Sequence, residues 1–567
     1  MRWYIPAMRK MRISAPLAAA CLCVSGFLFV ASVLWRHPGF PLDDSWIAVV
    51  MARNLAQYHV LGFYPGVRGP GATSLLWAVL FAAKFIFLKS VSPSAFSAVL
   101  CAVEIGVIGA LLKLITMRDG LPPAESWILA LAPLLSGNFL WLGGLGMEHV
   151  LFVMLSLAAL SAWFTGPGQR AGWSLAVSSI SLGLLVLTRP EGILLIAILL
   201  LFRKRANRSW KECWFPVLAT VIAEGITTWS NWTASHSLLP MTMKGRQWLY
   251  FGPKISPFYR ARFLEEIIFR AVFNWTIRAR GIWKIPPHPE AVFATAGGCA
   301  VLAAFALMAK YYLEKRSRTS ALLLWMLALF CTYFAILPNF AHAGRYQPFV
   351  VLLTPALLAI GALRLAQWLW SRICAEHPSH RIRAAGDRIV LASLALLLAL
   401  ATGTSLVVWR SVLRDGIDVI EGEHAVLGQW LSQNIPTTEL AAHRVGIVDI
   451  GRIGFELNGA LLDLGGLTDP DYLPYLMKGD VGPYLVQHQT HYLVLSSWRG
   501  EAHAGGAFLH IILPQPQSLF RLEELKTVCG PYPAAERSIP ETNSVQPCQT
   551  AYKLRYPGDN LPTETLR

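Results

Sequence analysis

Charged side chains are scarce in this sequence of 567 residues. Asp, Glu, Lys and Arg together make up 14% of the chain, whereas hydrophobic residues make up 54% and the mean hydropathy is +0.47. Soluble proteins carry about 25% charged residues. Apolar runs of roughly 20 residues, the length that a helix needs to cross a bilayer, recur along the chain. The composition therefore excludes an ordinary soluble domain and predicts an integral polytopic membrane protein.

Acidic residues are also in short supply, with 33 Asp and Glu against 49 Lys and Arg, so the net charge is +16. A basic chain can bind nucleic acid, but no RNA- or DNA-binding motif is present in this one. Its basic residues sit largely in short loops between apolar runs, where membrane proteins collect them on the cytoplasmic side. We therefore expect membrane lipid, and no nucleic acid, as a partner.

No clear small-residue cleavage site follows the first apolar run, at about residues 13–35. The basic residues before this run, from Arg2 to Arg12, resemble the start of a signal peptide. Because the run is long and lacks a cleavage site, we expect an uncleaved first span.

Cysteines are rare outside the apolar runs. Seven of the nine lie in or beside such runs, where we expect them to be small core residues. Cys529 and Cys548 both lie in the polar C-terminal region. If that region is extracytoplasmic, the two can form a disulfide, and the topology below favours this pairing over two free thiols.

The basic loops indicate which apolar runs cross the membrane. The N-terminus and residues 203–211, 310–318 and 364–388 should all be cytoplasmic. They share one side only if the run 74–88 does not cross, so we expect this run to form a re-entrant or outer-leaflet helix. The eleven expected crossings are 13–35, 96–117, 124–142, 148–165, 173–188, 191–203, 212–232, 289–309, 319–337, 346–366 and 389–409.

Two domains are expected. Residues 1–410 would form an α-helical polytopic domain with outer loops over 36–95 and 233–288, the first containing an amphipathic helix at 43–58. Residues 411–567 would form an extracytoplasmic α/β or mixed domain, because short apolar runs alternate there with Gly/Pro turns. These strand candidates are 445-VGIVDIG, 492-YLVLSS and 507-AFLHIIL.

Ionisable residues gather on the expected outer face, and such residues near membrane depth indicate function. Carboxylates suit a Mg²⁺ or Mn²⁺ ion, or one of them can serve as a general base. Arginine and lysine suit a phosphate. Together they suit a lipid-phosphate substrate whose tail stays in the bilayer. The residues are Asp43, Asp44, Glu148, Arg189, Lys244, His342, Arg345 and Tyr346.

Each of these residues also has a purely structural alternative. The acids of the first loop can be solvated or cap the helix 43–58, and Glu148 can cap the span 148–165. Arg189 can form a local ion pair with Glu191. Arg345 can anchor a helix end by snorkelling, and Lys244 can be one solvated charge among many.

Eight short motifs follow one another along most of the chain. They are 42-LDDSWIAVVMARNL-55, 62-GFYPG-66, 74-SLLW-77, 146-GMEH-149, 189-RPEG-192, 237-SLLPMTMKG-245, 344-GRYQPF-349 and 446-GIVDIGRIGFELNGALLDLGGLTDPD-471. In these motifs and their order the chain resembles the GT-C superfamily of glycosyltransferases, which use polyprenyl-phosphate-linked sugars at the outer face of the membrane. It most resembles the bacterial terminal arabinofuranosyltransferase-like subgroup, and it departs from the pattern of that subgroup at His149 and Met241.

The resemblance implies roles for the gathered residues. One of Asp43 and Asp44 would be the catalytic base, and the two acids with Glu148 would hold a divalent cation, Mg²⁺ or Mn²⁺, if one is used. The donor phosphate would be bound by Lys244, Arg345 and Tyr346, with Arg189 and His342 nearby. The departures from the family pattern leave the identity of the donor open.

The expected function is transfer of a sugar, such as arabinofuranose, from a polyprenyl-phosphate donor to a cell-envelope glycan at the outer face of the cytoplasmic membrane. A transporter of lipid-linked sugars is the main alternative, and it would show ionisable residues at the bilayer midplane and repeated spans. Here the charges gather at one face and no repeat is evident. Further alternatives are a protein O-glycosyltransferase and a non-catalytic glycan-binding protein.

Overall fold

The structure, a computed structural model, is mostly helical. It describes residues 15–165, 171–251, 254–261, 263–264, 306–307, 309–339, 344–373, 380–498, 519–530 and 547–557. The chain divides into two compact units that we treat separately. The helical unit consists of Met1–Arg36, Ser94–Ile226 and Ser256–Leu413, and the α/β unit consists of His37–Pro93, Thr227–Ile255 and Arg414–Arg567.

The two units do not follow the order of the chain. The expected boundary near residue 410 lies close to the observed one at Leu413. However, His37–Pro93 and Thr227–Ile255 belong to the same unit as the C-terminal segment, whereas the sequence groups them with residues 1–410. The candidate acids of the first loop are therefore part of the α/β unit.

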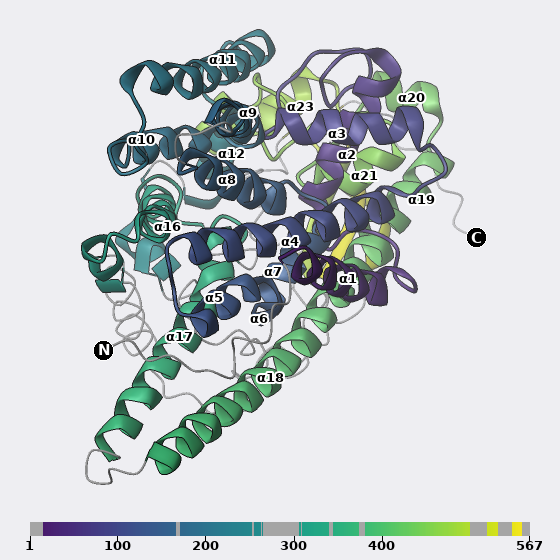
Figure 1. Ribbon diagram of the computed structural model, residues 1–567. Helices are drawn as coiled ribbons and strands as arrows, with labels where there is room; N and C mark the ends of the chain where they lie inside the picture. The colour runs from purple at the N-terminus through teal and green to yellow at the C-terminus, as the bar shows by residue number, and fades with distance from the viewer. Residues whose placement is uncertain are drawn as a thin grey trace. The chain divides into compact units, whose positions relative to one another are not determined.

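The helical unit contains long apolar helices (Figure 1). Among the described residues, four helices are long and apolar enough to cross a membrane: α4, α16, α17 and the helix Leu391–Asn434, of which the part up to Leu413 belongs to this unit. Helices α7 and α8, bent by 112° at their junction, make a fifth if they form one span. The chain is thus a multi-pass membrane protein, and the expected eleven crossings stay a prediction. The described helices are α1 (Ala15–Leu34), α4 (Pro93–Arg118), α5 (Pro123–Ala130), α6 (Ala132–Leu135), α7 (Gly137–Gly144), α8 (His149–Trp163), α9 (Ala171–Thr188), α10 (Ile193–Leu201), α11 (Trp210–Ser235), α16 (Ser317–Ile336), α17 (Pro348–Ile373) and α18 (His380–Val419).

The run 124–142, expected to form one span, is divided into α5, α6 and α7 in the structure, and its crossing of the membrane stays a prediction. Pro133 lies in the first turn of α6, where it lacks an N–H to continue the hydrogen bonding of α5. Ser136 then starts α7 by accepting a hydrogen bond from the N–H of Phe139. Gly137 lies so close to Ser405 that a Cβ there would come within 2.7 Å of its backbone oxygen. The run is apolar enough for a span, but its local residues break the helix.

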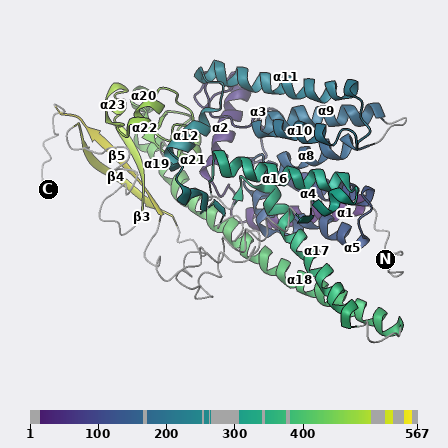
Figure 2. The same ribbon diagram turned by 90° about the vertical axis from the view of Figure 1, so that its left-hand side faces the viewer.

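The α/β unit is built around a five-stranded mixed sheet with the order β2-β1-β3-β5-β4. Figure 2 shows its strands β3, β4 and β5. Strands β2, β1 and β3 are parallel, and β5 runs antiparallel to β3 and β4. The expected strand at 507 lies outside the described residues. The elements of the unit are α2 (Asp43–Tyr58), α3 (Leu75–Phe87), α12 (Met241–Phe251), the π-helical turn η4 (Ile420–Ala425), α19 (Val426–Asn434), α20 (Thr437–Ala442), β1 (Val445–Ile447), α21 (Ile450–Glu456), β2 (Leu461–Asp463), α22 (Leu473–Lys478), α23 (Gly482–Gln487), β3 (Tyr492–Trp498), β4 (Arg521–Cys529) and β5 (Pro547–Arg555).

Side chains of the central strand β3 alternate between the two faces of the sheet, and each face packs on a hydrophobic core there. On one face, Val494 belongs to a core that includes Val50 of α2, Leu427 of α19 and Ile453 of α21. On the other, the adjacent Leu493 belongs to a core formed with α22 and α23. Helix α2 is thus fixed to the C-terminal segment by its apolar side, which leaves its first turn at the edge of that core. In Figure 1 the purple α2 accordingly lies among green helices of the same unit.

A disulfide joins Cys529 at the end of β4 to Cys548 in β5, the pair that the sequence suggests. The two residues are directly opposite in the antiparallel ladder. The bond therefore closes the loop between the last two strands, which is 19 residues from cysteine to cysteine.

Candidate active site

Helix α2 carries two adjacent acids in its first turn. The chain enters the helix through Leu42, which is extended (φ −133°, ψ 141°) and makes no capping hydrogen bond with its side chain. Asp43 and Asp44 follow it, where carboxylates are favoured by the helix dipole. They are first-turn residues rather than caps. The helix ends at Tyr58, because His59 adopts a left-handed conformation (φ 57°).

The carboxylate of Asp43 holds the α/β unit together. Its two oxygens accept hydrogen bonds from the backbone N–H groups of Gly451 (2.6 Å) and Arg452 (2.7 Å) at the start of α21. Nδ1 of His424 lies 3.3 Å from the same carboxylate. The approach needs glycine at 451, because a Cβ would lie 2.0 Å from the backbone oxygen of Asp43. Asp43 thus anchors the start of α2 to the C-terminal segment.

Asp44 has a different environment. Its Oδ2 lies 3.1 Å from Nη2 of Arg246 on α12, and its side chain keeps 19% of its surface exposed. A neighbouring guanidinium favours the ionised carboxylate. Asp44 is therefore a charged acid that is partly open to solvent, which is what a general base requires.

The loop 463-DLGGLT-468 is shaped by a buried carboxylate. Asp463 accepts hydrogen bonds from the backbone N–H groups of Gly465 (2.7 Å), Leu467 (2.7 Å) and Thr468 (2.5 Å), and from the Thr468 hydroxyl (2.9 Å). Burial raises the pKa of Asp463 to about 6, although these donors act in the opposite direction. The loop is thus held by one side chain from the end of β2.

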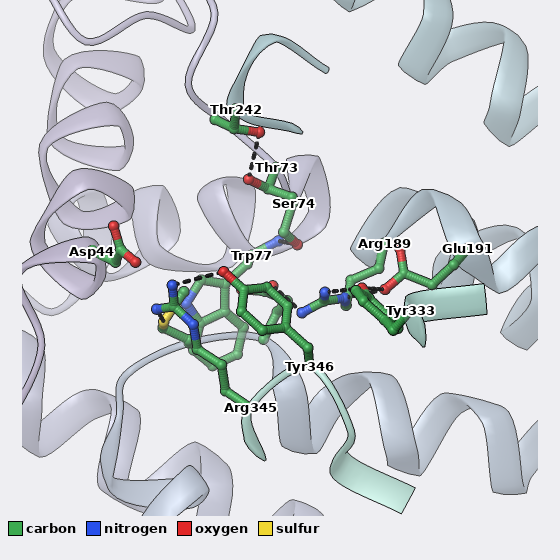
Figure 3. Close-up of polar contacts among 12 residues, drawn as sticks. Asp44, Thr73, Ser74, Trp77, Arg189, Glu191, Thr242, Tyr333, Arg345 and Tyr346 are labelled. Atoms are coloured by element: carbon green, nitrogen blue, oxygen red, sulfur yellow. Dashed lines mark hydrogen bonds and ion pairs between the residues drawn. The ribbon is translucent and has the colours of Figure 1, made fainter. Parts of the chain in front are cut away.

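Helix α12 packs directly on this loop. Gly245 contacts Gly466 so closely that a Cβ would lie 2.2 Å from its backbone oxygen. At the start of α12, the hydroxyl of Thr242 lies 3.2 Å from that of Thr73, which precedes α3 (Figure 3). Lys244, on the same helix, is half-buried and has no ion-pair or hydrogen-bond partner among the described residues. The α/β unit thus brings Asp44, Arg246 and the helix of Lys244 into one region.

In the helical unit, a second polar cluster is centred on Arg189, which ends α9. Its guanidinium forms ion pairs with Glu191 (2.6 Å) and Glu148 (3.2 Å), and donates a hydrogen bond to the hydroxyl of Tyr333. Figure 3 shows Glu191 and Tyr333 against the same guanidinium. These contacts favour the ion-pair alternative for Arg189 over phosphate binding. Glu148 precedes α8 without capping it.

Arg345 and Tyr346 lie beside this cluster in the helical unit (Figure 3). Arg345 is fully buried, and its Nη2 donates a 2.8 Å hydrogen bond to the hydroxyl of Tyr346. The ring of Tyr346 packs 5.6 Å from that of Tyr333. Burial of this guanidinium excludes simple snorkelling, since a snorkelling arginine keeps its head in water.

The chain is similar to one protein family in its C-terminal segment and to several solved structures in its fold. A family model described as a domain of unknown function, DUF8728, matches residues 416–536, and no curated protein matches the sequence. Several solved structures are similar, including the following three. ArnT from Cupriavidus metallidurans has a TM-score of 0.51 at 12% identity, over 95% of this chain and 98% of its own. The oligosaccharyltransferase AglB from Archaeoglobus fulgidus has a TM-score of 0.49 at 14% identity, over 84% and 69%. The arabinofuranosyltransferase AftD from Mycobacteria has a TM-score of 0.42 at 14% identity, over 94% and 41%.

The similarity to ArnT extends over nearly the whole of both chains. The chain therefore shares the fold of ArnT. The resemblance motifs fall in both units: Asp43 and Asp44 lie in the α/β unit, and Glu148, Arg189 and Arg345 lie in the helical unit.

The sequence alone does not reveal a buried polar cluster in the α/β unit. Its Asp449 accepts hydrogen bonds from Ser496 (2.9 Å) and Gln549 (3.1 Å), and the amide nitrogen of Gln549 lies 3.5 Å from Nε2 of His424. Burial raises the pKa of Asp449. His424 also contacts Asp43 and lies in η4, a π-helical turn of the kind that often marks functional sites. The cluster therefore connects the first-loop acids to the sheet.

Two further predictions concern His342 and a metal site at Asp43, Asp44 and Glu148. His342 lies outside the described residues. In the part of the chain that the structure describes, no group of three or more His, Cys, Asp or Glu side chains is placed to hold a metal ion. Both oxygens of Asp43 accept backbone hydrogen bonds, and Glu148 pairs with Arg189. These contacts do not fit a shared cation at the three predicted carboxylates, so we derive no catalytic step through one.

Proposed function

We propose that this protein is a glycosyltransferase that moves a sugar from a polyprenyl-phosphate donor to a cell-envelope glycan at the outer face of the cytoplasmic membrane. The GT-C fold supports the class of reaction. The observation that carries the proposal is the difference between the two acids of α2. Asp43 is fixed by the backbone of α21, whereas Asp44 is partly exposed and paired with Arg246.

Asp44 is the proposed catalytic base. Its carboxylate removes the proton of an acceptor hydroxyl as the hydroxyl oxygen attacks the anomeric carbon of the donor. The bond between that carbon and the phosphate oxygen breaks, and the lipid phosphate leaves with both bonding electrons. A direct displacement of this kind inverts the anomeric centre. Asp43 acts as a positioning residue, because its hydrogen bonds fix the first turn of α2.

The leaving phosphate requires cationic groups, since negative charge develops on it in the transition state. Lys244 suits this role because it is half-buried and has no acidic partner among the described residues. Arg345, held by Tyr346, is the proposed second phosphate ligand, as the family resemblance implies. Arg189 is less suited, because Glu148 and Glu191 already neutralise it.

The sugar and the cation are finer parts of the proposal. Arabinofuranose is the proposed sugar, on the strength of the motif resemblance. A requirement for Mg²⁺ or Mn²⁺ also stays a prediction. Dialysis of the purified enzyme against EDTA, followed by re-addition of either ion, measures it directly. Unchanged transfer after EDTA would remove the cation from the proposal.

The decisive experiment is transfer in vitro by the purified full-length protein, supplied with a panel of polyprenyl-phosphate sugars and a cell-envelope glycan acceptor. We expect Asp44→Asn to slow transfer by about 10²–10⁴, while the exposed Asp471→Asn variant keeps the wild-type rate. Movement of the lipid-linked sugar across proteoliposomes without any glycosylated product would instead support the transporter alternative. Product on a protein side chain in place of the glycan would support protein O-glycosylation.

A further inference from the structure

A cavity of 460 Å³ lies in the α/β unit, where the end of α2 meets the end of α3. Its lining comes from two short stretches. They are Ala56 and Gln57 of α2, and Lys84, Phe85, Ile86 and Lys89 at the end of α3. Two of these residues are cationic and none is acidic, so the lining suits an anion.

Lys84 is buried although it is charged. Only 4% of its surface is exposed, and its Nζ lies 4.2 Å from the centre of the Phe85 ring. Among the described residues it has no carboxylate and no hydrogen-bond partner for this ammonium group. Burial of an unpaired charge is costly, and a lysine of this kind is normally stabilised by an anion. An anion in the cavity would supply the missing partner.

The end of α3 also exposes an apolar surface beside the cavity. Phe87 is 78% exposed, and Val79, Ile86 and Leu88 are exposed as well. A helix with an exposed apolar side and cationic residues next to it is typical of segments that lie in the membrane interface. In that layer the abundant anions are the phosphates of lipid head groups. The position of the cavity beside this surface therefore favours a lipid phosphate over a soluble anion.

The side chains in the cavity match the oxygens of such a phosphate. The ammonium of Lys84 offers three hydrogen-bond donors within the cavity, and the amide of Gln57 offers two more. Lys89 is exposed at the end of α3 and adds a second positive charge. Phe85 and Ile86 provide apolar lining for the glycerol and the first acyl carbons. The cavity thus has polar side chains for the phosphate and apolar side chains for the start of the lipid tail.

We propose that this cavity binds the head-group phosphate of an anionic glycerophospholipid, with Lys84 as the buried ligand and Lys89 as a second, exposed one. The site is separate from the acids of α2, which lie at the other end of that helix. It also does not depend on the proposed glycosyl transfer. A lipid held here would fix the end of α3 to the membrane surface.

Lipid binding to the purified full-length protein tests this proposal. Native mass spectrometry in detergent would measure bound phosphatidylglycerol against phosphatidylcholine for the wild type and for Lys84→Gln, Lys84→Arg and Lys89→Gln. Lys478→Gln, an exposed lysine elsewhere in the unit, is the matched control. We expect at least a tenfold loss of phosphatidylglycerol affinity in Lys84→Gln, a smaller loss in Lys89→Gln, and no change in Lys84→Arg or the control.

Other outcomes would overturn the proposal. Equal binding of the two lipids, or unchanged binding in Lys84→Gln, would remove the site. Competition by millimolar inorganic phosphate as strong as that by the lipid would indicate a soluble-anion site, and Lys84-dependent binding of polyprenyl phosphate alone would indicate a donor site. If Lys84→Gln does not fold, the comparison of Lys89→Gln with the control decides, and equal affinities there count against the proposal.

Discussion

Nδ1 of His424 lies 3.3 Å from the carboxylate of Asp43, although 381 positions of the chain separate the two residues. The contact ties the start of α2 to the π-helical turn η4 near the start of the C-terminal segment. Because Asp43 also accepts two backbone hydrogen bonds from α21, it fixes the position of its neighbour Asp44. The base of the proposed reaction is thus positioned by residues that are remote in sequence.

Replacement of His424 should impair transfer without removing the base. We expect His424→Ala to lower kcat about tenfold or more and to leave KM for the donor nearly unchanged, because the Asp43 anchor is loosened while Asp44 is retained. Loss of a buried partner of a charged group also costs about 1–3 kcal/mol in the free energy of unfolding. Steady-state kinetics and thermal unfolding of the purified protein measure both effects. His488→Gln, on the opposite face of the sheet, is the control, and equal kinetics in both variants would contradict the positioning role.

Substitutions of Asp43 and Asp44 should have different effects, one on stability and the other on activity. We expect Asp44→Asn to reduce kcat by about 10²–10⁴, the range for loss of a general base, with little change in stability. Asp43→Asn should destabilise the fold by about 1–3 kcal/mol, since its amide group cannot accept both backbone N–H groups. Transfer rates and unfolding midpoints of the two variants provide the comparison. A stable, inactive Asp43 variant beside an active Asp44 variant would reverse the assignment.

The spacing of apolar residues was enough to predict both helices between residues 36 and 95. The helix at 43–58 is confirmed as Asp43–Tyr58, since its apolar spacing and its first-turn acids are visible in the sequence. The helix at 74–88 is found at Leu75–Phe87, where Ser74 accepts a hydrogen bond from the N–H of Trp77. The pair of Arg189 with Glu191 was one predicted alternative, because two residues that close in sequence meet readily.

Long-range partners could not be predicted in the same way. The contacts among Asp43, His424, Asp449 and Gln549 join residues from distant parts of the chain, and no motif sets the spacing between these four positions. Pro133, where the helix is interrupted, is visible in the sequence. The prediction of one span at 124–142 rested instead on the apolar composition of the whole run. Composition thus predicts burial, whereas proline and capping residues decide where a helix is interrupted.

The close approach of α12 to the loop 463–468 gives a test of the site's geometry. A Cβ at Gly245 would lie 2.2 Å from the backbone oxygen of Gly466, so Gly245→Ala must displace one of the two backbones. We expect a loss of about 1–3 kcal/mol in stability, and a lower kcat/KM because Arg246 moves away from Asp44. Gly225→Ala is the matched control, since a Cβ there meets nothing within 4 Å. Identical kcat/KM in both variants would show that α12 does not support the base.

The buried carboxylate of Asp463 should make stability depend on pH. Burial raises its pKa from the ordinary 3.8 to about 6, so between these values the folded protein holds a proton that the unfolded chain releases. The free energy of unfolding should therefore fall as the pH rises from about 4 to 6, by up to about 3 kcal/mol from this residue. Below pH 4 both states are protonated and this contribution is constant.

Unfolding midpoints of the wild type and of Asp463→Asn over pH 3.5–7.5 measure the effect, with the exposed Asp471→Asn as control. We expect the difference between wild type and Asp463→Asn to change through the window between pH 4 and 6, and the difference between wild type and Asp471→Asn to stay flat. Parallel curves for the wild type and Asp463→Asn would show that the carboxylate titrates alike in the folded and unfolded protein.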